Sequence, residues 1–474
     1  MKNKILLVVL LVATALREAW VWAHEAGPAE SYFRMCSQRL APGFFDGPAG
    51  TALLVRAFGD SFGSARLFWP VLALLCSWAA WIFIRRIYEA NTAARGVLLL
   101  NALPVFNRAA VEVGPLMPAL ISVLTGLIFA RLAWNGRRWA WVGAGVFFAA
   151  GILFRYEVVL MPAGLLAAAL AVRRHRADIP GLAVVVLLCG LALWPPLAWN
   201  ASLEWVPIAG GTWKSAWTFR AGPFLAGLAE LCRAFSIPVL LMVFVGAGFF
   251  VRRARLRARA GFLLAASGLA WVWCVYLLLR GGDAVAAAWL GFVPPAAFLA
   301  SSSIKWRRGR AAWAAVIVLA LGTGGYSLAG ARDPSWKAVA AELLAAARAL
   351  PAAGQGGFFI AEDPGLAAVL GCQIRADSGY PAVFVPESPD ISSQFALWPS
   401  YADFVDSSRV SDEYFTEQKG ENSFIGRDAV YIGHELPQTI KGAFTNVSPL
   451  KKIPGPHGRE LILYLCIGYQ TLPL

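Results

Sequence analysis

Long uncharged stretches separated by short basic clusters constrain this chain more than any other feature of its sequence. Hydrophobic residues make up 58% of the 474 residues and charged residues only 15%. Soluble domains are about 45–50% apolar and about 25% charged. A run of about 20 apolar residues is long enough to cross a bilayer as a helix. We therefore predict a polytopic membrane protein, and the composition excludes a disordered chain, collagen and a disulfide scaffold.

Nine stretches are clear candidates for membrane-spanning helices, and two others are interrupted or short. The clear stretches are 67–84, 113–130, 139–154, 158–172, 179–199, 234–251, 260–279, 284–304 and 311–331. The weaker stretches are 5–22, which contains Arg17 and Glu18, and 96–112, which contains Pro104. The sequence thus predicts a mainly α-helical bundle of about eleven spans.

Basic clusters fall after every second predicted span, which fixes the expected orientation. They are Lys2/Lys4, Arg85/Arg86/Arg95, Arg137/Arg138, Arg173/Arg174/Arg176, the five arginines of 252–259, and Lys305/Arg307/Arg308/Arg310. Because basic loops stay on the cytoplasmic side, we expect a cytoplasmic N-terminus and outer loops at about 23–66 and 200–222. The alternative in which the first segment is a cleaved signal peptide leaves this sidedness unchanged. The net charge of +14 therefore reflects membrane orientation, and no nucleic-acid partner is expected.

The last third of the chain has a different pattern. Residues 1–330 carry 31 basic and 12 acidic residues, whereas 331–474 carry 11 and 16. An Ala/Leu-rich helix is predicted at 336–350. Strands are predicted at 358–360, 382–385, 429–432 and 461–465. We predict a membrane domain at 1–331 and a small extracytoplasmic α/β domain at 332–474.

Charged residues near membrane depth are functional candidates, because burying them in lipid is costly. The first outer loop is the richest region and contains Glu25, Glu30, Tyr32 and Asp46. The four histidines are scattered and no Cys-x-x-Cys spacing occurs. The sequence therefore contains no metal motif, and its cofactors stay undefined.

The first outer loop resembles that of GT-C membrane glycosyltransferases of the protein-mannosyltransferase and aminoarabinose-transferase type. In that family the loop reads roughly D-E-A-Y-Y-x-x-W-S-x-x-L-A-x-G-Y-F-D-H-P-P. The matching residues here are Glu30, Tyr32, Ser37, Leu40, Ala41, Gly43, Phe45, Asp46 and Pro48. A following F-G-D-S-x-x-x-x-R-L pattern is matched at 58–67. Arg155-Tyr156 stands where the family has Lys-Tyr, and Trp199-Asn200 stands where it has Trp-Asn.

The departures from the family pattern concern its acidic residues. The family's catalytic base is the Asp that opens the first motif, and Ala29 stands at that position. The second acidic position, in a T-P-D-x-P-L pattern, aligns with Val113, one residue after Glu112. Glu30 is the predicted substitute for the base, with Glu25, Asp46 and Glu112 as further candidates. The alternative role for Glu30 is to cap a helix or to pair with an arginine such as Arg34.

The resemblance also implies cationic groups that neutralise a lipid phosphate. Arg66, Arg155 and Arg280 stand at the outer ends of predicted spans, and an arginine can bind a phosphate through two hydrogen bonds. Snorkelling of these arginines to the membrane interface is the alternative. The predicted substrate-binding residues are thus Glu25, Tyr32, Asp46, Arg66, Glu112, Arg155, Tyr156, Asn200 and Arg280.

The resemblance implies an inverting glycosyltransferase of a bacterial inner membrane. It would move a sugar from a polyprenyl-phosphate donor to a glycolipid, glycan or protein acceptor on the outer face. Loss of the acidic positions leaves open a catalytically inactive member of the same fold that binds lipid-linked sugars. A transporter is a third alternative, but the paired repeats common in such folds are absent from the sequence.

Overall fold

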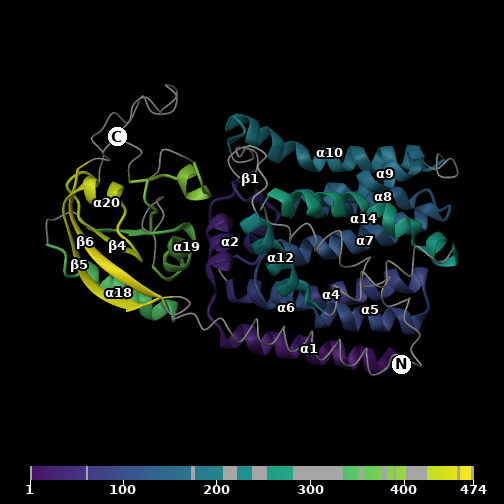
Figure 1. Cartoon of the computed structure of the whole chain (residues 1–474), viewed down its shortest axis with the longest axis horizontal. Helices are drawn as coiled ribbons and strands as arrows, with labels where there is room; N and C mark the ends of the chain where they lie inside the picture. The colour runs from purple at the N-terminus through teal and green to yellow at the C-terminus, as the bar shows by residue number, and fades with distance from the viewer. Residues whose placement is uncertain are drawn as a thin grey trace. The chain divides into compact units, whose positions relative to one another are not determined.

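A computed structural model describes residues 3–59, 62–171, 177–206, 221–237, 254–280, 285, 335–351, 357–374, 382–387, 391–401, 424–455 and 459–470. The chain divides into two compact units (Figure 1). The helical unit comprises Met1–His24, Leu40–Trp205 and Thr212–Gly330. The mixed unit comprises Glu25–Arg39, Val206–Gly211 and Ala331–Leu474.

The helical unit contains the membrane-crossing candidates. Among the described residues, four helices are long and apolar enough to cross a bilayer: α1 (Asn3–Ala23), α4 (Phe62–Ile87), α7 (Leu116–Trp134) and α10 (Ile179–Ser202). Large apolar side chains stay exposed on them, among them Leu16 (67%), Leu187 (62%) and Trp194 (70%). Contiguous exposed apolar surface of this kind suits contact with lipid and not with water. The chain is therefore an integral membrane protein.

Seven further helices of the helical unit lie in the described part of the chain. They are α3 (Gly50–Arg56), α5 (Ala90–Ala102), α6 (Pro104–Val111), α8 (Ala140–Ile152), α9 (Leu160–Ala171), α12 (Ala221–Phe235) and α14 (Ala254–Arg280). Helix α8 packs against both α7 and α10, and α9 packs against α14.

One predicted span is wrong as a single helix. The stretch 96–112 is divided between α5 and α6, which meet at the extended residue Leu103. Pro104 begins α6, and a proline pushes the residue before it out of helical backbone geometry. The predicted stretches 284–304 and 311–331, apart from residue 285, and residues 238–251 lie outside the described part of the chain.

The mixed unit contains a four-stranded sheet in the order β3-β4-β6-β5. Strand β3 (Phe358–Ala361) pairs parallel with β4 (Ala429–Gly433). Strand β6 (Glu460–Tyr469) pairs antiparallel with β4 and with β5 (Phe444–Pro454). The helices are α18 (Trp336–Ala347), α19 (Pro364–Gln373) and α20 (Gln438–Ala443). Every residue of β4 is buried, as expected for an inner strand.

Two elements of the mixed unit differ from the predicted pattern. The predicted strand at 382–385 is wrong, because only Phe384 pairs, through an isolated bridge to Ile360. Strand β5 was not predicted. Most of its residues are exposed, and it contains Pro449, Lys451 and Lys452, which are typical of an edge strand. Its sequence therefore lacks the alternation on which strand prediction depends.

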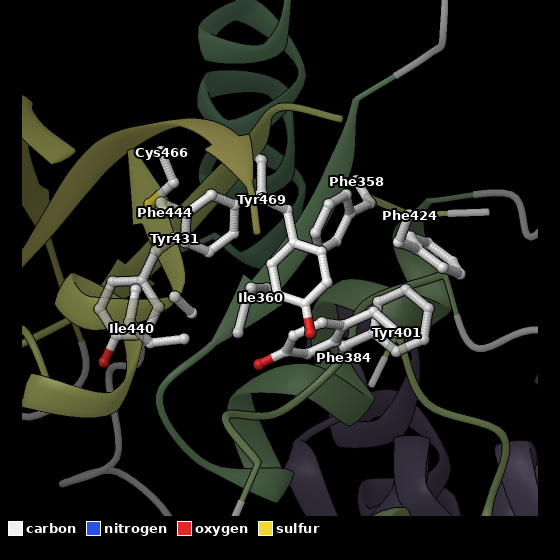
Figure 2. Packing of buried hydrophobic residues seen from close by; sticks show 12 residues of the cluster. Phe358, Ile360, Phe384, Tyr401, Phe424, Tyr431, Ile440, Phe444, Cys466 and Tyr469 are labelled. Carbon is white, nitrogen blue, oxygen red and sulfur yellow. The ribbon is translucent and has the colours of Figure 1, made fainter. Parts of the chain in front are cut away.

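An aromatic cluster fills the core beside the sheet (Figure 2). Phe358 lies at its centre, with ring centroids of Phe424 at 5.1 Å and Tyr401 at 5.4 Å. Tyr469 lies 5.3 Å from Tyr401. Burial, with a smaller contribution from the Glu387 carboxylate, raises the pKa of Tyr469 to about 12. These tyrosines are therefore neutral packing groups at physiological pH.

Helix α2 (Pro28–Gln38), which contains the first half of the outer-loop motif, belongs to the mixed unit. It packs against α19, where Gly371 lies close to the Met35 side chain. The thiol of Cys372 donates to the Ser31 carbonyl at 3.4 Å. The motif at 28–38 is therefore held by the C-terminal part of the chain, although more than 300 residues separate them.

Candidate active site

Two of the predicted acidic residues interact with the N-termini of helices in the mixed unit. The Glu25 carboxylate accepts from the Ser335 hydroxyl at 3.0 Å and from the Trp336 amide at 2.8 Å, at the start of α18. The Glu30 carboxylate accepts from the Gly27 amide at 3.1 Å, at the start of α2, and is only 3% exposed. A carboxylate is favourable at a helix N-terminus, where backbone amides lack partners. The contacts of Glu30 are those of the capping alternative.

Tyr32 lies on α2 in an aromatic environment. Its ring centroid is 5.5 Å from that of Phe33 and 6.5 Å from that of Trp398. The Arg39 guanidinium lies 5.2 Å from the centre of the Trp398 ring. Aromatic rings of this kind can stack against a sugar or an isoprenoid chain. Contact between Tyr32 and substrate stays a prediction.

Asp46 lies in the turn of a short hairpin in the helical unit. The hairpin joins β1 (Gly43–Phe44) to β2 (Gly47–Pro48). Before the turn, Gly43 fits against the Trp199 ring of α10, which a Cβ would approach to 2.9 Å. After it, the Gly50 amide donates to the Leu153 carbonyl at 2.7 Å, at the end of α8. The hairpin is therefore fixed to the ends of α8 and α10.

Gly50→Ala is expected to detach the hairpin from α8. A Cβ at Gly50 would overlap the Leu153 carbonyl oxygen, and a backbone atom cannot move aside cheaply. We expect a loss of about 1–3 kcal/mol in the free energy of unfolding, measured by thermal unfolding of the full chain in detergent. Gly63→Ala is the matched control, because nothing lies within 4 Å of a Cβ there. Equal unfolding midpoints for the two variants would contradict the claim that the close approach of Gly50 to Leu153 stabilises the fold.

Arg155 forms an ion pair with Glu157 immediately after α8. Nη2 lies 2.6 Å from Glu157 Oε1, and Nε donates to Oε2 at 3.1 Å. Both side chains are about one-fifth exposed, at 22% and 21%. Arg155 has extended backbone, with φ −149° and ψ 125°. A short 3-10 helix, Tyr156–Val159, begins at the next residue, so Glu157 lies in its first turn and the side chain of Arg155 just before the helix reaches it.

Tyr156 and Asn200 place two further polar groups near this ion pair. The Asn200 side chain faces the Tyr156 hydroxyl and is 2% exposed. Its amide nitrogen donates to the Pro196 carbonyl at 2.7 Å. Among the described residues, neither the Tyr156 hydroxyl nor Asn200 Oδ1 has a well-formed hydrogen bond. The two polar groups therefore face each other, close to the Arg155–Glu157 pair.

The remaining predicted residues have other contacts. Arg66 Nη1 donates to the His24 carbonyl at 2.9 Å, at the end of α1, which is a helix-capping arrangement. The Arg280 guanidinium lies 5.5 Å from the centre of the Tyr276 ring on α14. Glu112 pairs with Arg108 at 2.9 Å, and this arginine side chain is 70% exposed.

The structure thus brings five residues to one end of the α8–α10 pair: Asp46, Arg155, Tyr156, Glu157 and Asn200. Glu25, Glu30 and Tyr32 belong to the mixed unit. Glu157 is absent from the predicted set, although a carboxylate two residues after an arginine is a sequence signal for an ion pair of this kind. Within the described residues, no group of three or more His, Cys, Asp or Glu side chains is arranged to hold a metal ion.

Comparison with known proteins matches one segment of the chain to a protein family. Residues 48–199 match the dolichyl-phosphate-mannose-protein mannosyltransferase family. This segment contains α3–α9 and the Arg155–Glu157 pair. A search of curated proteins finds no match by sequence.

Two similar solved structures are crystal structures of ArnT from Cupriavidus metallidurans. The one bound to undecaprenyl phosphate has a TM-score of 0.62 at 15% identity, covering 100% of this chain and 99% of that chain. The apo structure has a TM-score of 0.59 at 16% identity, covering 96% and 97%. At such identities the likeness is one of fold. The family match over 48–199 and this fold confirm the expected resemblance to GT-C membrane glycosyltransferases of the protein-mannosyltransferase and aminoarabinose-transferase type.

Proposed function

We propose that the chain transfers a sugar from a polyprenyl-phosphate donor to an acceptor on the outer face of a bacterial inner membrane. The observation that carries this proposal is the cluster of Asp46, Arg155, Tyr156 and Asn200. It lies in a chain that shares its fold with an ArnT crystallised with undecaprenyl phosphate. The positive-inside pattern supports a cytoplasmic N-terminus, about eleven spans and an extracytoplasmic mixed unit.

The donor phosphate would bind at Arg155. When the bond between the sugar C1 and the phosphate oxygen breaks, negative charge develops on the leaving phosphate. A guanidinium held in place by Glu157 stabilises this charge without having to reorganise. The open hydrogen-bonding capacity of Tyr156 and Asn200 supplies further contacts to the phosphate or the sugar.

Asp46 would act as the base. The acceptor hydroxyl gives its proton to the Asp46 carboxylate as its oxygen attacks C1, and the lipid phosphate leaves with the bonding electrons. Attack opposite the leaving phosphate inverts the configuration at C1. Asp46 is favoured over Glu30 because its hairpin is fixed to the ends of α8 and α10, close in the chain to Arg155 and Asn200, whereas the Glu30 carboxylate caps α2.

Glu30→Gln is expected to leave transfer within about threefold of the wild-type rate. The amide oxygen of Gln can still accept from Gly27, so the change removes mainly the favourable charge at the helix N-terminus. We expect a loss of about 0.5–1 kcal/mol in the free energy of unfolding. Transfer and thermal unfolding should be measured on the same preparation. A loss of transfer of 100-fold or more with unchanged stability would make Glu30 the base.

A non-catalytic role is the second candidate function, and a specific observation favours it. Ala29 replaces the family's catalytic Asp, and Glu25 and Glu30 both contact helix N-termini. A chain that binds lipid-linked sugars during envelope glycan assembly would keep Arg155, Tyr156 and Asn200 without needing a base.

The experiment that separates these candidates is a mass-spectrometric comparison of glycolipids and surface glycans in a deletion strain. If the protein is a transferase, one sugar disappears on deletion and returns with the wild-type gene but not with Asp46→Asn. If Asp46→Asn and Glu157→Gln each restore the sugar while Arg155→Met does not, neither carboxylate is needed as a base and the binding role is favoured. An unchanged glycan profile in a strain that normally expresses the protein would contradict the proposed function.

A further inference from the structure

Five arginines gather at the end of the helical unit where α4 and α7 finish and α8 begins. Arg85 and Arg86 lie in the last turn of α4, and Arg131 lies in the last turn of α7. Arg137 and Arg138 lie in the turn between α7 and α8. We call these five residues the basic end. The candidate active site lies at the opposite end of α8, about 20 Å away along this helix of 13 residues.

Contacts between α4 and α7 bring their basic residues to one level. Near the start of both helices, Trp69 Nε1 on α4 donates to the Gly114 carbonyl, just before α7, at 3.1 Å. At the far end, Tyr88, immediately after α4, interacts electrostatically with Arg131 in the last turn of α7. The two helices therefore run in the same direction, and their basic last turns lie together.

Arg131 is the best-fixed member of the basic end. It is partly buried, and its guanidinium carbon lies 5.5 Å from the centre of the Phe262 ring on α14. Trp134, at the end of α7, packs on the same ring, with centroids 5.6 Å apart. A guanidinium held against an aromatic ring loses little further freedom when it binds a ligand. Arg131 is therefore already positioned to bind an anion.

The other four arginines of the basic end are exposed, and the neighbouring sequence hardly balances their charge. Residues 80–95 and 131–140 contain six arginines and a single acidic residue, Glu89. Glu89 interacts with Arg95, which lies outside the basic end. Further arginines stand at 255, 257 and 259 in the first turns of α14. The basic end therefore presents a positive surface that attracts anions.

The depth of the basic end brings it to lipid headgroups. Helices α4 and α7 are long and apolar enough to cross a bilayer, so their ends lie near the headgroups. Tryptophan is enriched at this level. Trp139 is 63% exposed beside Arg138, and the guanidinium carbon of Arg85 lies 4.9 Å from the centre of the Trp81 ring. In Figure 1 the basic end is on the side where the N-terminus is marked, which is cytoplasmic in the predicted orientation. Anionic lipids of the cytoplasmic leaflet attract basic segments.

We propose that the basic end binds the headgroup of an anionic phospholipid in the cytoplasmic leaflet. Arg131 is the fixed contact to the phosphate, because its planar guanidinium matches two phosphate oxygens, and the exposed arginines add long-range attraction. Membrane orientation alone accounts for exposed basic residues. It does not account for a guanidinium held against α14 within the same cluster. The site is independent of the sugar transfer proposed above, because it lies at the other end of α8.

Native mass spectrometry of the full chain with added phosphatidylglycerol tests this proposal. We expect Arg131→Gln to lower the fraction of protein that retains the lipid about fivefold, the effect of one basic residue at a charged membrane surface. Arg137→Gln combined with Arg138→Gln should lower it about 25-fold, and these exposed side chains can be replaced without opening the core. Arg108→Gln, at an exposed arginine paired with Glu112 near the opposite end of the helical unit, is the control and should leave retention unchanged.

Three results would overturn the proposal. Equal retention of phosphatidylglycerol and phosphatidylcholine by the wild type would remove the preference for an anionic headgroup. Wild-type retention by both sets of Gln variants, with unchanged thermal unfolding, would mean that the arginines only orient the chain in the membrane. Complete displacement of the lipid by millimolar inorganic phosphate would mean that the site takes free phosphate.

Discussion

Asp46→Asn is expected to lower the rate of sugar transfer about 10²–10⁴-fold, the range typical of losing a general base. Asn is nearly the same size and can sit in the same hairpin turn, so the fold should survive. The reason for the loss is chemical, because an amide cannot take the proton of the acceptor hydroxyl. The measurement is the rate at which the sugar identified in the deletion strain is restored in membranes that contain equal amounts of each variant.

Glu30→Gln is the matched control for Asp46→Asn, because it makes the same chemical change at a carboxylate that caps a helix. We expect the two variants to differ by at least tenfold in rate. Equal rates would remove Asp46 from the mechanism and direct the search to Glu157.

Arg155→Met is expected to lower transfer about 10²–10³-fold, because the developing phosphate charge loses its neutralising group. The substitution also leaves the Glu157 carboxylate without its partner. Unfolding could therefore account for part of the effect. The double variant Arg155→Met with Glu157→Gln removes both charges, and we expect it to regain thermal stability without regaining transfer.

Arg155→Lys supplies the second control. It keeps the positive charge, and lysine is the residue that the resembling family has at this position. We expect it to retain at least a tenth of the wild-type rate. A loss as large as that of Arg155→Met would mean that the fixed fork of the guanidinium, and not its charge, is what the site requires. Recovery of transfer in the double variant would contradict a role for Arg155 at the phosphate.

The described membrane helices could be predicted from sequence because lipid imposes one local requirement, a long apolar run. The exception is instructive. The run at 96–112 is mostly apolar, but Pro104 divides it into α5 and α6. Hydropathy alone does not register a backbone constraint of this kind. Strand β5 was missed for a related reason, because an exposed edge strand has little burial pattern to detect.

The candidate site was only partly predictable, because its residues are set by contacts between distant segments. The resemblance located Arg155, Tyr156 and Asn200, and the structure places them near one another. The resemblance could not show that α2 packs on α19. For that reason Glu30, next to the missing Asp in sequence, was the leading base. Asp46 becomes the preferred base only when the hairpin that carries it is seen to be fixed to α10 and α8. The contacts that fix it are those of Gly43 with Trp199 and of Gly50 with Leu153.

The most direct test of the central claim is an experimental structure of the full chain in a lipid nanodisc with undecaprenyl phosphate. We predict that its phosphate lies within about 2.7–3.2 Å of a guanidinium nitrogen of Arg155, the ordinary hydrogen-bond distance, on the side where Asp46 can reach the sugar carbon of a donor. A phosphate bound elsewhere, with Arg155 still paired only to Glu157, would contradict the account.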